Sequence, residues 1–202
     1  DLPTVNYEGL EGEPRVEIAR GDLTNSSDVG AACEGMDAIA HLAAILPPVA
    51  EARPELTRNV NIDGTRVVVE AVQAKAPSAR LVLSSSVSVY GDTTPQGDEI
   101  TVGHPTDPDD VYAASKAESE RIVVESGLDW VALRISGVAV PVFQEPPAEW
   151  PFTPDERIEF VHRDDAVSAL SAALTAPDSG RNVFNVSGGP TWRMSGEKYV
   201  ND

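Results

Sequence analysis

Residues 80–85 read RLVLSS and residues 38–44 read AIAHLAA, and these two nearly uninterrupted apolar runs decide the fold class. A strand that is apolar at almost every position is typical of a parallel sheet covered on both faces. Between the runs, apolar residues recur at helical spacing from Leu56 to Lys75, and Pro77 lies just beyond that helix. A strand, a helix and a second strand in this order predict a Rossmann-like, doubly wound parallel sheet of the α/β class.

The same alternation extends over the rest of the chain. Further strands are expected at residues 15–19, 129–135, 158–161 and 182–186, and further helices at 26–33, from Pro108 to just before Gly127, and at 164–174. Asp107 is expected to cap the helix that follows it. The proline-dense residues 141–154 should be irregular and close to a binding surface. We expect one domain, residues 1–202, with substrate-side segments at about 137–160 and 187–202.

Composition excludes several classes of protein. The chain has 202 residues, is 41% hydrophobic and carries a formal net charge of -18, so nucleic acid and anionic membrane surfaces are not expected partners. We find no apolar run long enough to span a membrane and no signal-peptide profile, and we expect a cytoplasmic protein. Cys33 is the only cysteine, which excludes an intrachain disulfide, and no metal site is expected. A packed helix cysteine is the favoured interpretation of Cys33.

The residues with the clearest chemical meaning are Tyr112 and Lys116, in the segment YAASK. Residues four apart share one face of a helix and can point at one site. A free phenol is a poor base at neutral pH, and a nearby lysine cation is expected to lower its pKa. On this spacing alone, a solvated pair on an exposed helix remains the more common alternative.

A hydroxyl cluster at the end of the 80–85 strand changes that judgement. The segment from Ser84 to Gly91 reads SSSVSVYG, and ligands of open α/β sheets bind at the carboxyl ends of the strands. A serine-rich turn that only caps local backbone groups is the alternative. A strand-end serine cluster followed by a Tyr-x-x-x-Lys helix is far rarer than either piece alone.

With these motifs in place, the sequence resembles the extended short-chain dehydrogenase/reductases, the NAD-dependent epimerase/dehydratase group. The matching segments, in family order, are Gly21–Leu23, His41–Ala44, Asn61–Thr65, Ser84–Gly91, Tyr112–Lys116, Phe160–Asp165 and Phe184–Val186. The resemblance covers nearly the whole chain and implies a Rossmann-like fold and a nicotinamide cofactor.

The resemblance also implies roles for individual residues. Ser86 would hold the substrate hydroxyl or carbonyl, Tyr112 would exchange its proton, and Lys116 would tune Tyr112 and bind the nicotinamide ribose. The cofactor-binding residues would be Asp1, Asp22, Leu23, Leu42, Ala43, Ala44, Asn61, Ser84, Tyr112 and Lys116.

Each of the cofactor assignments has an alternative. Leu42–Ala44 would be core residues in any buried strand, Asp22 could serve only a turn, and Asp1 could be a frayed terminal residue. His41 and His162 are interpreted as structural. Asp164 and Asp165 are expected to cap the helix that they precede.

The sequence departs from the family pattern at several places. No Gly-x-x-Gly-x-x-Gly turn precedes the first matching segment, and the chain opens at Asp1 without a methionine. We therefore expect a chain that lacks the N-terminal strand, turn and helix and has a small or incomplete substrate lobe. The missing strand would expose apolar sheet edges, so we expect the chain to be unstable as a monomer or to form oligomers. Gly137 stands where nucleotide-sugar enzymes usually carry asparagine.

The leading hypothesis is an oxidoreductase or epimerase that transfers hydride between NAD and a sugar-like or other polyhydroxy small molecule, with NADP left open as the cofactor. By the family resemblance, we expect a homodimer formed through the helix that carries Tyr112. One rival is a truncated, inactive family member that serves as a binding or assembly module. Another is an unrelated flavodoxin-like or nucleotide-binding domain.

Overall fold

The computed structural model describes residue 10 and residues 12–95, 99–140 and 152–201. The helices are α1 Ser26–Cys33, α2 Val49–Ala52, α3 Pro54–Thr57, the π-helix η1 Arg58–Asp63, α4 Gly64–Lys75, α5 Val111–Glu125, α6 Arg163–Thr175 and α7 Gly196–Asn201. The 3₁₀ turns are η2 Val87–Tyr90, η3 Pro177–Ser179 and η4 Gly189–Trp192. The strands are β1 Ala38–His41, β2 Arg80–Ser86, β3 Asp129–Ile135, β4 Gly137–Ala139, β5 Arg157–His162, β6 Asn182–Val186 and β7 Arg193–Ser195.

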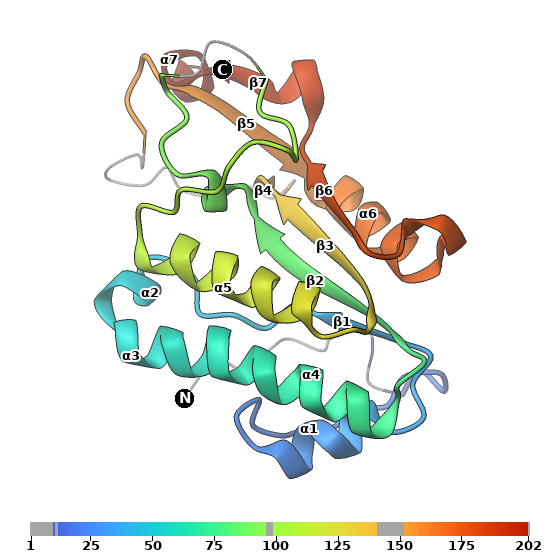
Figure 1. The fold of residues 1–202 in the computed structure, drawn as a ribbon. Helices are drawn as coiled ribbons and strands as arrows, with labels where there is room; N and C mark the ends of the chain where they lie inside the picture. Colours follow the sequence, from blue (N-terminus) through green and yellow to red (C-terminus); the bar gives the residue numbers. More distant parts are fainter. Residues whose placement is uncertain (1–9, 11, 96–98, 141–151, 202) are drawn as a thin grey trace.

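The main sheet has four parallel strands in the order β1-β2-β3-β6 (Figure 1). The register pairs His41 with Leu83, Ser86 with Ile135, and Ile135 with Val186. The carboxyl ends of the strands therefore lie along one edge of the sheet, as expected for the predicted α/β class.

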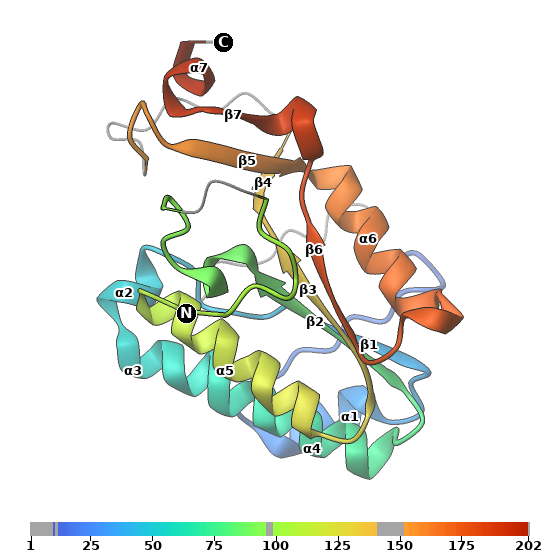
Figure 2. The ribbon, with the colours of Figure 1, turned by 45° about the horizontal axis from the view of Figure 1, so that its top comes forward.

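Helices cover both faces of this sheet (Figure 2). Helices α1, α4 and α5 pack on one face, in a core that includes Val72, Leu81 and Val123, and all three side chains are almost completely buried. Helix α6 packs on the other face against a core that includes Val82 and Val131. The strands β2 and β3 are buried on both faces, which is why they are apolar at nearly every position.

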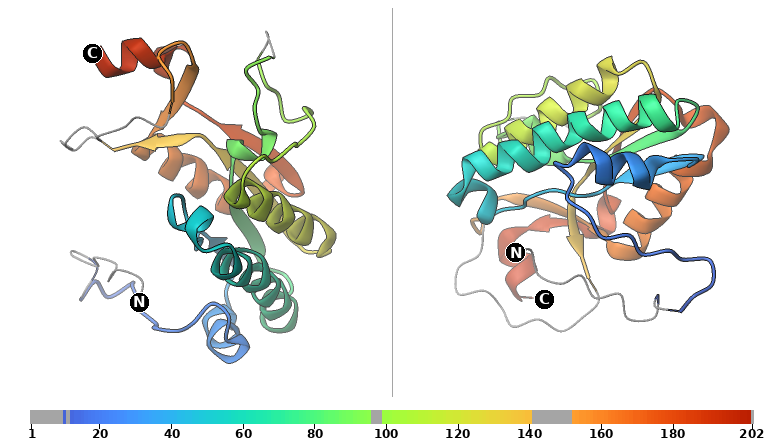
Figure 3. Two further views of the ribbon diagram at one scale, coloured as in Figure 1. Left: turned by 90° about the vertical axis from the view of Figure 1, so that its left-hand side faces the viewer. Right: turned by 90° about the horizontal axis from the view of Figure 1, so that it is seen from below.

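A smaller sheet, with the order β4-β5-β7, lies beyond the carboxyl ends of β2 and β3 (Figure 3). Aromatic side chains pack together around this sheet. The rings of Phe160 on β5 and Tyr199 on α7 stack with centroids 4.8 Å apart, and Phe152, which precedes β5, meets Tyr199 edge to face at 5.6 Å. Most of the predicted irregular segment 141–154 falls outside the described residues.

Several predicted boundaries were wrong. Residues 15–19 form no strand: they are exposed and pair with no strand among the described residues, and a strand needs a partner for its backbone groups. The run 38–44 is a strand only over β1, because beyond it the backbone of Ile45 bonds to Asn61 rather than to β2. Strand β1 is also less buried than predicted.

Two predicted helix caps were wrong as well. Helix α5 begins after Asp110, whose side chain accepts a hydrogen bond from the Ala113 N–H at 2.6 Å, and not after Asp107. The backbone N–H of Asp107 is bonded to the Val89 carbonyl, which places that residue in the loop packed on η2. Helix α6 is capped by His162, whose ring nitrogen accepts from the backbone N–H of Asp164 at 3.2 Å.

Asp164 and Asp165 lie in the first turn of α6 rather than at its cap, where negative charge still suits the positive end of the helix dipole. Gly127, with φ of 77°, follows the end of α5 as predicted. Cys33 is buried at the end of α1, as predicted. Among the residues that the structure describes, no helix is long and apolar enough to cross a membrane.

Candidate active site

Ser86 and Tyr112 meet at the carboxyl edge of the sheet. Ser86 ends β2 and caps the turn η2, and its hydroxyl accepts hydrogen bonds from the Ser88 N–H at 3.2 Å and the Ser88 hydroxyl at 2.8 Å. The Tyr112 side chain lies near Ser86, which acts to lower the pKa of its phenol. The structure thus brings together two of the three predicted catalytic residues.

Lys116 lies one turn further along α5 and is 4% exposed. Burial lowers the pKa of Lys116 to about 8, while the charge of Glu120 acts in the opposite direction. His41, at the end of β1, is also buried, and its Nε2 lies 2.9 Å from the Thr65 hydroxyl. Burial, aided by the charge of Lys116, lowers the pKa of His41 to about 4, so this ring is neutral at pH 7, in keeping with a structural role.

The electrostatics of Tyr112 differ from the expectation. Burial raises the pKa of Tyr112 above its usual value, the interaction with Ser86 lowers it, and the charge of Asp110 raises it again. The net shift is upward, because burial disfavours the phenolate more than the neighbouring groups stabilise it. The predicted lowering of the Tyr112 pKa by Lys116 is therefore not present. Burial destabilises the lysine cation itself.

This burial predicts a pH-dependent effect of Lys116 on stability. Folding lowers the lysine pKa from 10.5 to about 8, so the unfolded chain binds more protons between these values and the free energy of unfolding rises with pH across this window. We expect Lys116→Met to stabilise the chain by on the order of 3 kcal/mol at pH 7, and by much less near pH 10. Urea unfolding at both pH values measures the difference.

Lys75→Met is the matched control, because Lys75 lies exposed in the last turn of α4. It should change stability little at either pH. An unchanged or lowered stability of Lys116→Met at pH 7 would show that burial of the ammonium carries no such penalty.

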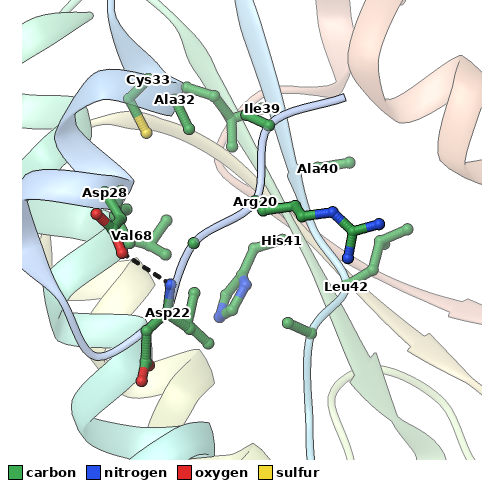
Figure 4. A pocket seen from close by; sticks show the side chains of 15 residues that line it. Arg20, Asp22, Asp28, Ala32, Cys33, Ile39, Ala40, His41, Leu42 and Val68 are labelled. Carbon is green, nitrogen blue, oxygen red and sulfur yellow. Dashed lines mark hydrogen bonds between the residues drawn. The ribbon is translucent and has the colours of Figure 1, made fainter. Parts of the chain in front are cut away.

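A groove of about 430 Å³ lies beside β1, between α1 and the segment 19–23. Figure 4 shows Asp22 at one side of the groove beside Asp28, with Leu42 and Arg20 across from them. The predicted cofactor residues Asp22, Leu23, Leu42 and Ala43 all line it. Ser86, Tyr112 and Lys116 do not line this groove.

The exposure of Leu42 argues against the alternative that this segment is simply core. Leu42 is 53% exposed and Ala43 is also exposed, whereas a core strand would bury both. Ala44 is half-buried. An apolar side chain that faces a groove instead of the core is a candidate ligand contact.

The remaining predicted cofactor residues differ in their surroundings. Asp22 is exposed, and hydrogen bonds from Thr24 lower its pKa, so it serves a turn while it lines the groove. Ser84 is half-buried in β2, and Asp1 lies outside the described residues.

Asn61 plays a structural part. Its side-chain oxygen Oδ1 accepts a hydrogen bond from the Ile45 N–H at 2.7 Å. Its side-chain nitrogen Nδ2 donates to the Ile45 carbonyl at 3.1 Å and to the Ser115 hydroxyl at 2.9 Å. The Ser115 hydroxyl in turn donates to the Tyr112 carbonyl at 2.7 Å. Asn61 therefore joins the segment after β1 to the helix that carries Tyr112.

A buried ion pair supports the site and was missed in the sequence. The guanidinium of Arg134 on β3 binds the carboxylate of Glu120 on α5 through Nη2–Oε2 at 2.7 Å, and both side chains are 8% exposed. Arg134 also donates to the Tyr90 hydroxyl at 2.8 Å, and Tyr90 donates to Asn185 on β6 at 2.7 Å. Ser85 completes the pair by donating to Glu120.

Two signals in the sequence pointed to this pair. Glu120 follows Lys116 by four positions and so shares its helix face, and Arg134 interrupts an otherwise apolar strand. A buried arginine requires an acceptor, and a carboxylate on the facing helix supplies it. No group of three or more histidine, cysteine, aspartate or glutamate side chains among the described residues could hold a metal ion.

Comparison with known proteins identifies the family. The model of the NAD dependent epimerase/dehydratase family matches residues 4–147. The chain belongs to this family. The resemblance of the sequence motifs to the epimerase/dehydratase family is thereby confirmed. The rival interpretation, an unrelated flavodoxin-like or nucleotide-binding domain, is excluded.

Relatives of this epimerase/dehydratase chain include a 3-beta-hydroxysteroid dehydrogenase of Mycolicibacterium neoaurum, 34% identical over 140 residues, which are 64% of this chain and 38% of the relative. A D-erythronate dehydrogenase of Haemophilus influenzae is 28% identical over 145 residues, 70% of this chain and 45% of the relative. The chain thus spans less than half the length of these curated relatives.

Solved structures show the same fold. A dTDP-glucose 4,6-dehydratase from Streptomyces venezuelae with NAD bound has a TM-score of 0.83 at 23% identity, over 95% of this chain and 64% of that one. The UDP-glucose 4-epimerase of Thermus thermophilus with NAD has a TM-score of 0.80 at 24% identity, over 99% of this chain and 71% of that one. The predicted Rossmann-like fold is confirmed.

Proposed function

We propose that the protein is an NAD-dependent oxidoreductase or epimerase that acts on a hydroxyl or carbonyl group of a sugar-like or other polyhydroxy small molecule. The observation that carries this proposal is the placement of Ser86 at the end of β2 near the Tyr112 phenol, with Lys116 one turn further along the same helix. Family membership and the dehydrogenase names of two relatives support it.

The described residues fit a nicotinamide dinucleotide. The apolar groove formed by Leu23, Leu42 and Ala43 would hold its adenine side, and Asp22 would contact adenine at the rim of this groove. The ammonium of Lys116, for which the described residues supply no hydrogen-bond partner, would bind a ribose hydroxyl. When bound, NAD supplies the electron acceptor for the carbinol carbon.

The residues of the chain perform the proton chemistry in this proposal. Ser86 donates a hydrogen bond to the substrate oxygen, and Tyr112 takes up or returns the proton of that oxygen. A protonated Lys116 lowers the cost of forming the Tyr112 phenolate once a ligand brings the two groups into one polar site. The upward pKa shift of Tyr112 keeps the phenol protonated until then.

Two assays on a panel of substrates test the proposal. Absorbance of NADH detects net oxidation, and NMR of the products detects epimerisation or dehydration, in which the hydride returns to the substrate and no net NADH is formed. The panel contains D-erythronate, UDP-glucose, dTDP-glucose and a 3-beta-hydroxysteroid, and it is applied to this chain and to any longer form that its gene encodes. Turnover of a polyhydroxy substrate that is lost in Ser86→Ala, with Ser78→Ala as the exposed control, is the expected result. NAD binding without turnover of any of them would instead favour a binding module.

The proposal includes a homodimer formed through the face that carries α5. The family resemblance implies this dimer. The activity, substrate and partners proposed here are those of the whole protein.

A further inference from the structure

Glu51 reaches from α2 to the amino end of the helix that carries Tyr112. Its two carboxylate oxygens accept hydrogen bonds from the backbone N–H groups of Val111 and Tyr112, each at 3.1 Å. The next N–H, that of Ala113, is taken by Asp110. The first N–H groups of a helix have no partner within it, so two carboxylates from separate segments satisfy three of them here.

The segment that carries Glu51 is held firmly. Ala50 is completely buried, and its carbonyl accepts from the Thr57 hydroxyl at 3.0 Å. The N–H of Ala50 donates to the Leu46 carbonyl at 3.0 Å. The exposed carboxylate of Glu51 therefore extends from a fixed backbone, which makes a defined capping geometry possible.

Tyr112 is consequently tied to this segment through both of its backbone groups. Its N–H donates to Glu51, and its carbonyl accepts from Ser115, which in turn accepts from Asn61. Asn61 holds Ile45, which lies two positions after Ala43, the last residue of this segment that lines the groove. The backbone of Tyr112 and the wall of the groove thus belong to one bonded unit.

We propose that Glu51 is a positioning residue for Tyr112: it fixes the amino end of α5 against the segment that lines the groove, and so sets where the phenol stands relative to a ligand there. The inference rests on the proposed function in that Tyr112 is taken as the general acid and base. Glu51 acts through the backbone and touches no reacting atom.

The charged groups around this end of α5 determine what a change in the titration of Tyr112 would report. Asp110 and Lys116 lie on α5 itself, Glu51 comes from α2, and His41 of β1 senses the charge of Lys116. The pair formed by Glu120 and Arg134 lies one turn beyond Lys116, and Glu55 on α3 is exposed. Glu51 is not among the groups that shift the pKa of Tyr112, and its carboxylate lies at the backbone N–H groups, so a changed titration of the phenol in a Glu51 variant would report displacement of the Tyr112 side chain.

The test compares Glu51→Ala, Glu51→Gln and Glu55→Gln in the 202-residue chain. Amide hydrogen exchange at Tyr112, followed by NMR, should become about fivefold faster in Glu51→Ala, as expected when one hydrogen bond of about 1 kcal/mol is lost. Glu51→Gln keeps one acceptor oxygen in an isosteric side chain, so it should restore part of the protection. Glu55→Gln should have no effect.

The second readout is the titration of the ¹³Cζ signal of Tyr112, assigned with Tyr112→Phe. Its midpoint should shift in Glu51→Ala and return part of the way in Glu51→Gln, because movement of Tyr112 changes its burial and its interaction with Ser86, which set the pKa of the phenol. If exchange and midpoint in both Glu51 variants match those of Glu55→Gln, the positioning role is refuted. Neither readout requires turnover, so a failure of the proposed function would show itself separately, in the substrate assay.

Discussion

Tyr112→Phe is expected to lower kcat by about 10³-fold with NAD and a substrate that is turned over, the usual scale for loss of a general acid/base. The substitution removes only the hydroxyl that interacts with Ser86, and the ring keeps its packing on α5. KM for NAD and the unfolding temperature should stay close to their values in the unchanged protein. Steady-state kinetics and thermal unfolding measure the three quantities.

The contrast between kcat and stability is the informative part of this experiment. A fall in kcat that accompanies an equal loss of folded protein would reflect misfolding and not chemistry. A kcat within about threefold of the unchanged protein would contradict the general acid/base role of Tyr112, because the hydroxyl is the only group removed.

Arg134→Met is expected to give the largest loss of stability, about 3–5 kcal/mol, because it leaves the carboxylate of Glu120 buried without its guanidinium partner. Both side chains are 8% exposed, so water cannot replace the lost partner. Loss of the bond to Tyr90 should also loosen the contact with β6. Urea unfolding at pH 7 measures the change in the free energy of unfolding.

Arg121→Met is the control on the same helix as Glu120. Arg121 is 53% exposed and pairs with Glu118 and Glu125 at the surface, so its loss should change stability little. The double variant Glu120→Leu with Arg134→Met should recover much of the stability, because neither charge of the pair is left buried without its partner. A small effect of Arg134→Met alone would mean that Glu120 finds another cation or becomes protonated at little cost.

Much of the fold could be predicted because its signals are local. The strands β2 and β3 are apolar nearly throughout, and both were predicted within a residue of their observed bounds. The predictions failed where the outcome depends on distant partners. Residues 15–19 alternate like a strand but pair with no strand among the described residues, and Asp107 has the local signature of a cap although its backbone is bonded to Val89.

The candidate site shows the same division. Tyr112 and Lys116 share a helix face by spacing alone, whereas their pKa shifts depend on burial, which the sequence does not give. The ion pair of Arg134 with Glu120 joins a strand to a helix and becomes visible only in the fold. The two contacts of Glu51 join segments 60 and 61 positions apart, so no local pattern could have shown them.

Calorimetric titration tests most directly whether NAD binds in the groove beside β1. NAD is titrated into this chain and into any longer form that its gene encodes, and the variants Leu42→Glu and Leu46→Glu are compared. Both leucines are exposed, at 53% and 57%, but only Leu42 lines the groove. If NAD binds in this groove, we expect one NAD per chain. Leu42→Glu should reduce the affinity at least about tenfold, because its carboxylate repels the pyrophosphate, and Leu46→Glu should leave the affinity unchanged. Absence of NAD binding in every form, or binding that Leu42→Glu leaves unaltered, would contradict NAD binding in the groove.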